Sequence, residues 1–281
     1  MYISTEKRCE AHLVTITGAA PLHRYIYIDG GYVRQRFEYY ASRYFNGDPL
    51  DFDYNALFHE YQKRFYYDCL PPRRNGEDES TFKKRKDGMR DFFTRLRELR
   101  GFHVYEGKLS GDGERVRQKG VDIQLAVHML THVSRGIVRR VTLMAGDADF
   151  EPLAEAVVAE GAFLTLWADK RSVSTRLRHA ADEYEPFHIS NLFAALSSQF
   201  KSVHPLPEVS GRTGQHHEGL SLLRRGVLPD GSEAKLYAAN GRAILIYPST
   251  TTSFMHITWQ TPELVMHIAE DLGANISWNN G

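Results

Sequence analysis

The sequence has few cysteines and no long apolar segment. Cys9 and Cys69 are its only cysteines in 281 residues, which excludes both a disulfide framework and a zinc site built on cysteines. Its apolar runs are short, such as the run from Gly161 to Ala168, whereas a membrane-spanning helix needs roughly 20 residues. We therefore expect no membrane association.

The first residues of the chain also lack the pattern of a secretory signal. Charged residues stand where a signal peptide would carry its apolar core, namely Glu6, Lys7, Arg8 and Glu10. With 25% charged and 42% hydrophobic residues, the composition is that of an ordinary globular protein. We therefore expect a cytoplasmic protein.

Net charge is absent as well, because 35 basic residues balance 35 acidic ones. This balance argues against a broadly cationic nucleic-acid-binding protein, so any surface for a polyanion must be local. Between Lys83 and Arg100 there are eight basic residues and three acidic ones. A solvated helix face is the simplest interpretation of that stretch.

Short apolar runs alternate with longer helical patterns from residue 24 to about residue 200. Strands are expected at 25–28, 64–68, 102–108, 141–144 and 163–167, and helices at 33–45, 81–100, 122–134, 150–160 and 174–181. Such alternation predicts βαβ units, and hence an α/β fold with a mostly parallel sheet flanked by helices. In the helix 122–134 an apolar stripe predicts the buried face: Ile123, Ala126, Val127, Leu130 and Val133.

Four regions are expected along the chain. An N-terminal extension (1–23) precedes the α/β domain (24–200), and a segment rich in Pro, Ser, Gly and His (201–218) is expected to be a linker. The region 219–281 shows strand patterns at 234–238, 243–247 and 254–259 and a helix at 262–272, which predicts a small α+β module. It carries no chemical motif. Such a module could form a homo-oligomer, recruit a protein partner or extend a nucleic-acid groove.

Four aspartates stand where a doubly wound sheet binds its ligands. Asp29 closes the first strand, Asp122 opens a helix, and Asp147 and Asp149 follow the strand 141–144. Ligands of such sheets bind outside the carboxyl ends of the strands. Taken singly, each aspartate is explained as a turn or helix-cap residue. Together they would repel one another unless a cation or basic side chains neutralised them, and an all-oxygen cluster suits Mg²⁺ or Mn²⁺.

The same residues carry a family resemblance. Four blocks are involved: Tyr27-Ile28-Asp29-Gly30, Lys119-Gly120-Val121-Asp122, the loop from Ala145 to Phe150, and the segment from Ser174 to Asp182. The first three, in their order, resemble the three signature blocks of NYN-domain (LabA-like) proteins, and the fourth resembles the family's closing segment, so the likeness spans roughly residues 24 to 190. The resemblance implies a PIN-like Rossmannoid fold and metal-dependent ribonuclease activity, with Asp29, Asp122, Asp147 and Asp149 as metal-binding acids.

Three positions depart from the family pattern. Tyr32 stands where the family commonly has Asn, His128 where many members have an acid, and Ala145 where Ser is common. Tyr32 and His128 are therefore auxiliary candidates at the site. His128 and His132 have a zinc-like spacing of four residues, but no third ligand is suggested nearby, so a structural role is favoured.

Basic residues near these blocks are candidates for holding a nucleic-acid backbone. Lys119 lies three residues before Asp122, and Lys170, Arg171 and Arg176 follow the strand 163–167. Lysine and arginine contact phosphates without reading sequence. The tyrosines and phenylalanines between residues 37 and 67 could stack on bases, although most are expected in the core.

The leading hypothesis is a metal-dependent ribonuclease, most simply an endonuclease, that hydrolyses RNA phosphodiester bonds with Mg²⁺ or Mn²⁺. Asp29, Asp147 and Asp149 would hold the ion, and Asp122 would complete its shell or orient the water. The alternative is a non-catalytic NYN-like module that binds RNA or a protein. A dinucleotide-binding domain is disfavoured because the first strand is not followed by G-x-G-x-x-G.

Overall fold

The structure is a computed structural model that describes residues 24–110, 117–213, 219–250 and 253–279. At residues 108–110 and 117–119 it describes the backbone alone. The expected N-terminal extension (1–23) lies outside the described residues. Within the described part of the chain, no helix combines the length and the apolar character needed to cross a membrane.

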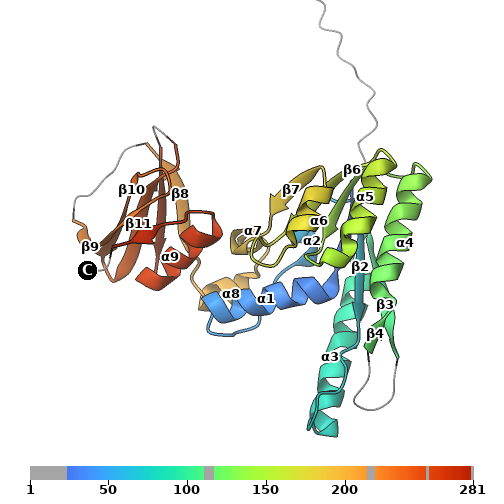
Figure 1. The fold of residues 1–281 in the computed structure, drawn as a ribbon. Coiled ribbons are helices and arrows are strands. Elements are labelled where there is room, and N and C mark those ends of the chain that lie inside the picture. Colours follow the sequence, from blue (N-terminus) through green and yellow to red (C-terminus); the bar gives the residue numbers. More distant parts are fainter. Residues whose placement is uncertain (1–23, 111–116, 214–218, 251–252, 280–281) are drawn as a thin grey trace, which may run out of the picture.

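The first domain is built on a seven-stranded sheet with the order β4-β3-β2-β1-β5-β6-β7 (Figure 1). Six neighbouring strands are parallel, and β4 pairs antiparallel with β3 at one edge. The strands are β1 (Arg24–Asp29), β2 (Lys63–Cys69), β3 (Phe102–Ser110), β4 (Arg117–Lys119), β5 (Arg140–Met144), β6 (Phe163–Ala168) and β7 (Glu183–Pro186). The predicted α/β fold with a mostly parallel sheet is confirmed.

Helices cover both faces of this sheet. They are α1 (Gly30–Tyr44), α2 (Tyr54–Leu57), α3 (Glu79–Glu98), α4 (Val121–Ser134), the 3₁₀ turn η2 (Ala148–Phe150), α5 (Glu151–Ala159), α6 (Thr175–Ala180), α7 (Ile189–Phe193) and α8 (Ser198–Val203). Side chains alternate between the two faces of a strand, and on β2 the rings of Phe65 and Tyr67 contact α4 while Tyr66 contacts α3. Helices α3 and α4 therefore lie on opposite faces.

Helix α4 buries a different face from the one predicted. Leu125, Met129 and Val133 are buried, whereas the side chains of Ile123 and Val127 are 71% and 55% exposed. The helix is apolar around most of its circumference, so the sequence pattern did not distinguish the face against the sheet from the neighbouring one. The predicted stripe was therefore wrong at its first turns.

The second domain is a six-stranded antiparallel sheet with the order β13-β9-β10-β11-β12-β8, covered by one helix. Its elements are β8 (Glu208–Arg212), β9 (Ser221–Val227), β10 (Glu233–Ala239), β11 (Arg242–Pro248), β12 (Phe254–Trp259), α9 (Pro262–Asp271) and β13 (Ser277–Trp278). This agrees with the predicted α+β module. Strand β8, however, lies in the stretch that was predicted to be a linker. It is an edge strand that pairs with β12, and because it shows little apolar alternation the sequence did not indicate it.

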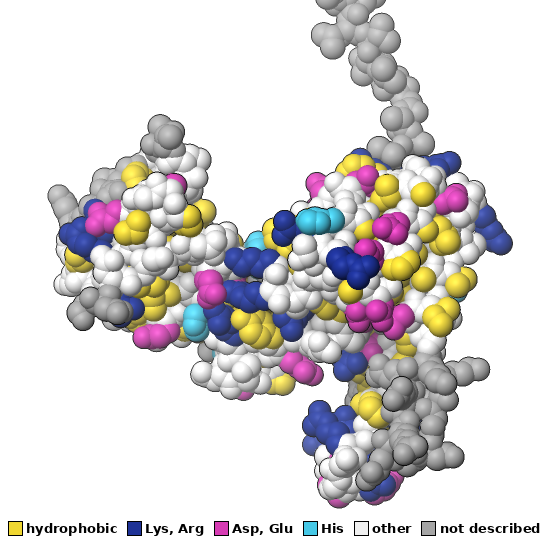
Figure 2. All heavy atoms as spheres, in the orientation of Figure 1, with side chains coloured by type: hydrophobic (Ala, Val, Ile, Leu, Met, Phe, Trp, Pro, Cys, Tyr) yellow, Lys and Arg dark blue, Asp and Glu magenta, His cyan; other side chains and the backbone are white. Residues whose placement is uncertain are grey.

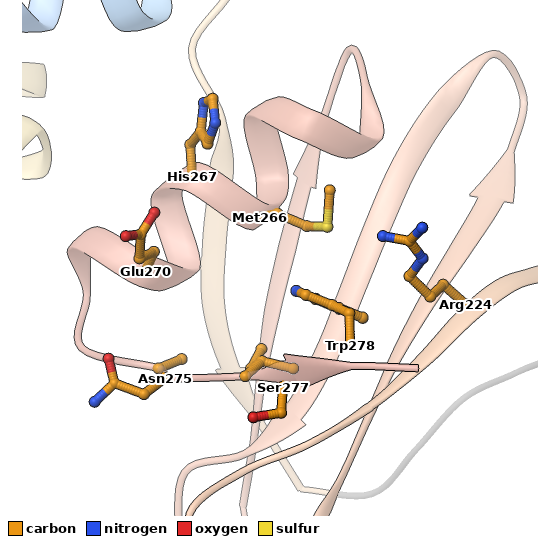
Figure 3. Close-up of a pocket in the computed structure, with 9 residues that line it drawn as sticks. Arg224, Met266, His267, Glu270, Asn275, Ser277 and Trp278 are labelled. Carbon is orange, nitrogen blue, oxygen red and sulfur yellow. The ribbon is translucent and has the colours of Figure 1, made fainter. Parts of the chain in front are cut away.

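The second domain has an open cleft of about 500 Å³ between α9 and the strands β9 and β13. Figure 3 shows Met266 on the helix, with Trp278 and Arg224 beside it. None of the four candidate aspartates lines this cleft.

Candidate active site

Asp29 ends β1 and begins α1. Its Oδ1 accepts a hydrogen bond from the backbone N–H of Tyr32 at 3.1 Å, so the carboxylate caps the helix and is half-buried. The residue after Asp29 is a glycine, and the backbone there passes directly over Tyr66. A Cβ at residue 30 would lie 2.5 Å from the Tyr66 ring, so a larger residue would not fit. Backbone packing at the end of the strand thus fixes the position of Asp29.

Asp147 and Asp149 lie in the loop that follows β5. Oδ1 of Asp147 accepts from the backbone N–H of Asp149 at 3.0 Å and caps η2, and both side chains are exposed. Gly146 is tightly enclosed, since a Cβ there would lie 2.4 Å from the carbonyl oxygen of Ser172 and 2.5 Å from the ring of Tyr32. The loop is therefore held against the segment that follows β6.

Asp122 stands in the first turn of α4 and is exposed. The preceding Gly120 adopts a left-handed conformation with φ of 85°, which lets the chain turn from β4 into the helix. Because α4 and α5 begin at the carboxyl edge of the sheet, Asp122 lies at the same edge as Asp29, Asp147 and Asp149. The structure thus brings the four predicted aspartates to one edge.

These carboxylates influence one another electrostatically. Burial raises the pKa of Asp29 to about 6, and the negative charges of Asp122 and Asp68 add to the effect. Burial also raises the pKa of Asp122, together with the charges of Asp147 and Asp149. The ion pairs among the described residues include none of the four aspartates. The cluster therefore carries negative charge that no described basic side chain neutralises.

The donor atoms suit a hard divalent cation in type and charge. All are carboxylate oxygens, the ligands that Mg²⁺ and Mn²⁺ prefer, and none of them forms an ion pair with a described basic side chain. Among the described residues, however, no three His, Cys, Asp or Glu side chains are arranged closely enough to hold a metal ion. The chemistry of the donor set fits, while these side-chain positions are not those of a formed metal site.

A fifth aspartate at this edge escaped the sequence analysis. Asp68, on β2, is 2% exposed, and its two carboxylate oxygens accept hydrogen bonds at 2.8 and 2.9 Å from the guanidinium of Arg34 on α1. The backbone N–H of Cys69 donates a further bond at 2.7 Å. Its place near the end of the second strand was the available signal. The bidentate pair with Arg34 gives Asp68 a structural partner that Asp29 lacks.

A groove of about 480 Å³ runs between α4 and α5 from this edge. Asp122 and Asp149 line it together with apolar side chains of both helices: Ile123, Ala126, Val127, Leu130, Phe150, Pro152, Leu153 and Ala156. Figure 2 shows acidic and hydrophobic side chains close together on this part of the visible face. Two of the four aspartates are therefore accessible from a surface groove.

A family model for the NYN domain matches residues 26–190, which is more than half of the chain and includes all four aspartates. The chain belongs to the NYN-domain family. NYN domains are part of the PIN-like nuclease superfamily. One similar solved structure is a protein of unknown function from Vibrio parahaemolyticus, at 19% identity over 62% of this chain and 96% of that chain, with a TM-score of 0.43. No curated protein matches the sequence.

Tyr32 of this NYN domain connects two loops of the site. Its hydroxyl accepts from the backbone N–H of Asp169 at 2.8 Å and lies 3.1 Å from Oγ of Ser172. The same ring packs against Gly146, next to Asp147. Tyr32 thus supports the loop that carries Asp147 instead of presenting a free polar group to a ligand.

The two histidines of α4 are bonded to tyrosines of the sheet. Nδ1 of His128 lies 3.0 Å from the hydroxyl of Tyr67, and Nδ1 of His132 lies 2.7 Å from that of Tyr27. Burial lowers the pKa of both imidazoles. These contacts agree with the structural role favoured from the sequence, and no described group of three ligands forms around them.

The four basic candidates of the NYN domain have different surroundings. The side chain of Lys119 lies outside the described residues. Lys170 donates to the carbonyl oxygen of Glu270 at 2.7 Å, and Arg171 forms ion pairs with Glu270 and Asp271. Lys170 and Arg171 thus contact the second domain, an arrangement the sequence did not indicate.

Arg176 lies closer to the aspartates. It forms an ion pair with Glu151 at 2.7 Å, and its side chain is 76% exposed. Glu151 begins α5 directly after η2, so this pair stands beside the loop of Asp147 and Asp149.

Proposed function

We propose that this NYN domain is a metal-dependent ribonuclease that cuts RNA internally, with Asp29, Asp122, Asp147 and Asp149 as its catalytic and metal-binding acids. The observation that carries the proposal is that carboxylates from three separate segments meet at one edge, without an ion-pair partner among the described residues. Besides burial, the charge of Asp122 contributes to the raised pKa of Asp29, and the charges of Asp147 and Asp149 contribute to that of Asp122. Such repulsion lowers stability and is relieved when a cation binds. Membership of a nuclease superfamily supports the same assignment.

The chain's own residues contribute positioning and charge. The hydrogen bond from the backbone N–H of Tyr32 orients the carboxylate of Asp29, and the close packing around Gly146 holds the loop of Asp147 in place. Mg²⁺ or Mn²⁺ would supply positive charge to the scissile phosphate and to the attacking water. Arg176 is the basic side chain best placed to contact an adjacent phosphate, because it is exposed beside the acids. Lys119, Lys170 and Arg171 remain candidates for the more distant backbone.

The decisive experiment compares cleavage of a labelled single-stranded RNA by the wild type and by Asp147→Asn, with Mn²⁺, Mg²⁺ or EDTA. We expect wild-type cleavage that EDTA abolishes, and a loss of at least about 100-fold in the variant. Glu155→Gln is the matched control, since it removes one exposed carboxylate from α5 without touching the four aspartates. Its cleavage rate should equal that of the wild type.

Thermal unfolding separates a chemical role from a structural one. Asp147→Asn should unfold at the wild-type temperature or slightly above it, because it removes one repelling charge. A much lower unfolding temperature would assign Asp147 a structural role. If neither cleavage nor Mn²⁺ binding is found in the wild type, the chain is a non-catalytic NYN module that binds RNA or a protein.

A further inference from the structure

The first part of α3, residues 79–90, forms an arm that projects past the carboxyl edge of the sheet (Figure 1). Tyr66 of β2 contacts Phe93 of α3, with 6.3 Å between the ring centroids. From that contact towards the carboxyl edge of the sheet, β2 extends for three residues, about 10 Å. In the same direction, α3 extends for fourteen residues back to its first residue, about 21 Å. The arm therefore extends roughly 10 Å beyond the edge where the four aspartates lie.

The pattern of buried residues along α3 also indicates that the arm projects beyond the sheet. The buried residues of the helix, Phe93 and Leu96, both belong to its second half, and the arm itself has none. Next to it, β3 runs beyond the last residue it pairs with β2 and joins β4 in a hairpin. The chain then passes directly from β4 into α4 and Asp122. Arm and hairpin thus stand at the side of the acidic edge.

Positive charge on the arm exceeds what its own acids neutralise. Arg85 pairs with Glu77, Arg73 with Glu79, and Arg90 with Asp87. The carboxylate of Asp78 caps the helix by accepting from the backbone N–H of Thr81 at 2.9 Å. Three lysines of the arm have no ion-pair partner among the described residues: Lys83, Lys84 and Lys86. Figure 2 shows basic side chains on the visible part of the arm.

This surplus of positive charge is local, because the whole chain has no net charge. Arg34 and Arg171 of the same domain, by contrast, are paired with acids. Lysines on a projecting helix that have no ion-pair partner in the described part of the chain, next to an acidic edge that repels phosphates, would attract a polyanion towards one side of the site. Backbone phosphates are the regularly spaced anions that suit such a surface.

We propose that the α3 arm binds the sugar-phosphate backbone of a nucleic-acid strand beside the cleavage site, with Lys83, Lys84 and Lys86 as the contacting residues. This inference rests on the proposed nuclease function, because that function supplies the nucleic-acid strand that the arm would bind. A projection of about 10 Å corresponds to about three nucleotides of a stacked strand at about 3.4 Å each. The arm contacts phosphates alone, so it does not distinguish RNA from DNA.

Fluorescence anisotropy with the full chain in EDTA tests the arm without any cleavage. The probe is an unstructured, labelled 20-nucleotide RNA, titrated at several salt concentrations. The arm variant is Lys83→Gln, Lys84→Gln and Lys86→Gln combined. The matched control combines Lys63→Gln, Arg135→Gln and Arg139→Gln, three exposed cations at the opposite, amino-terminal edge of the same sheet.

We expect the arm variant to raise the Kd about tenfold, and to reduce the slope of log K against log salt by about 2, at about 0.7 for each lost phosphate contact. The control should change the Kd less than twofold, and a DNA of the same length should lose as much affinity as the RNA. Circular dichroism and thermal unfolding confirm that each variant is folded.

Failure of this inference can be told apart from failure of the proposed function. Equal RNA binding by the arm variant and the wild type overturns the arm as a binding surface, even if metal-dependent cleavage is observed. An equal loss in the control also overturns it, because any cation would then suffice. Weaker binding by the arm variant together with no cleavage under any metal supports the arm and rejects the nuclease activity. A wild type that binds neither RNA nor DNA overturns the arm.

Discussion

The ring of Tyr44 stacks on that of Trp259, with 5.8 Å between the centroids and 21° between the planes. Tyr44 is the last residue of α1, the helix that Asp29 caps, and Trp259 is the last residue of β12 in the second domain. The Tyr44 hydroxyl also donates to the carboxylate of Asp271 and to the carbonyl oxygen of His267. One helix therefore connects the acidic edge to the second domain.

Tyr44→Phe should lower the stability of this junction while leaving the ring stack in place. The change removes both bonds of the hydroxyl, and Asp271, which is 5% exposed, keeps Arg171 as its partner. We expect a loss of about 1–2 kcal/mol in the free energy of unfolding, measured by denaturant titration. Tyr39→Phe on the same helix is the control, since no hydrogen bond of its hydroxyl is described. Equal stability of the two variants would show that the junction contributes little.

Gly146→Ala should disturb the active-site loop without removing a carboxylate. The added Cβ would lie 2.4 Å from a backbone carbonyl oxygen at Ser172, so the loop preceding Asp147 must move. We expect a destabilisation of about 1–3 kcal/mol and weaker Mn²⁺ binding by calorimetry. Gly88→Ala in α3 is the comparison, because nothing lies within 4 Å of its added Cβ and alanine favours a helix. Wild-type Mn²⁺ affinity in Gly146→Ala would argue against Asp147 as a ligand.

Asp29→Asn should change how stability depends on pH in the absence of metal. The folded-state pKa of Asp29, about 6, exceeds its usual 3.8, so the folded protein binds this proton more tightly and loses stability as pH rises from about 4 to 6. Burial is the main cause of the higher pKa and the charges of Asp122 and Asp68 add to it, whereas the backbone N–H groups of Tyr32 and Gly31 lower it. Asparagine caps a helix equally well and stays neutral.

The variant should therefore be more stable than the wild type at pH 7, by on the order of 1 kcal/mol, and the advantage should shrink towards pH 4. Chemical denaturation at several pH values in EDTA measures it. Adding Mn²⁺ at pH 7 should stabilise the wild type more than the variant, because bound cation relieves the same repulsion. A pH-independent difference between the two proteins would contradict the raised pKa of Asp29.

The local sequence pattern was sufficient to predict the parallel sheet and the edge of the sheet that carries the four aspartates. A buried strand such as β1 has an apolar run that ends at Asp29, and the carboxyl ends of parallel strands meet at one edge. The same reasoning could have included Asp68, near the end of β2. It failed for α4, because a helix that is apolar on several sides does not reveal which side meets the sheet. It also failed for β8, an edge strand stabilised by pairing with β12 and not by burial.

The alternation of strands and helices and the family blocks around Asp29, Asp122 and Asp147 could be identified from the amino-acid sequence, because they depend on residues close together in the chain. Which charges form ion pairs depends on the folded chain. Arg171 meets Asp271 and Arg34 meets Asp68 across long sequence separations, whereas the lysines of the α3 arm and the four aspartates have no such partner among the described residues. Ion pairing depends on distance in space, and only the folded chain sets those distances.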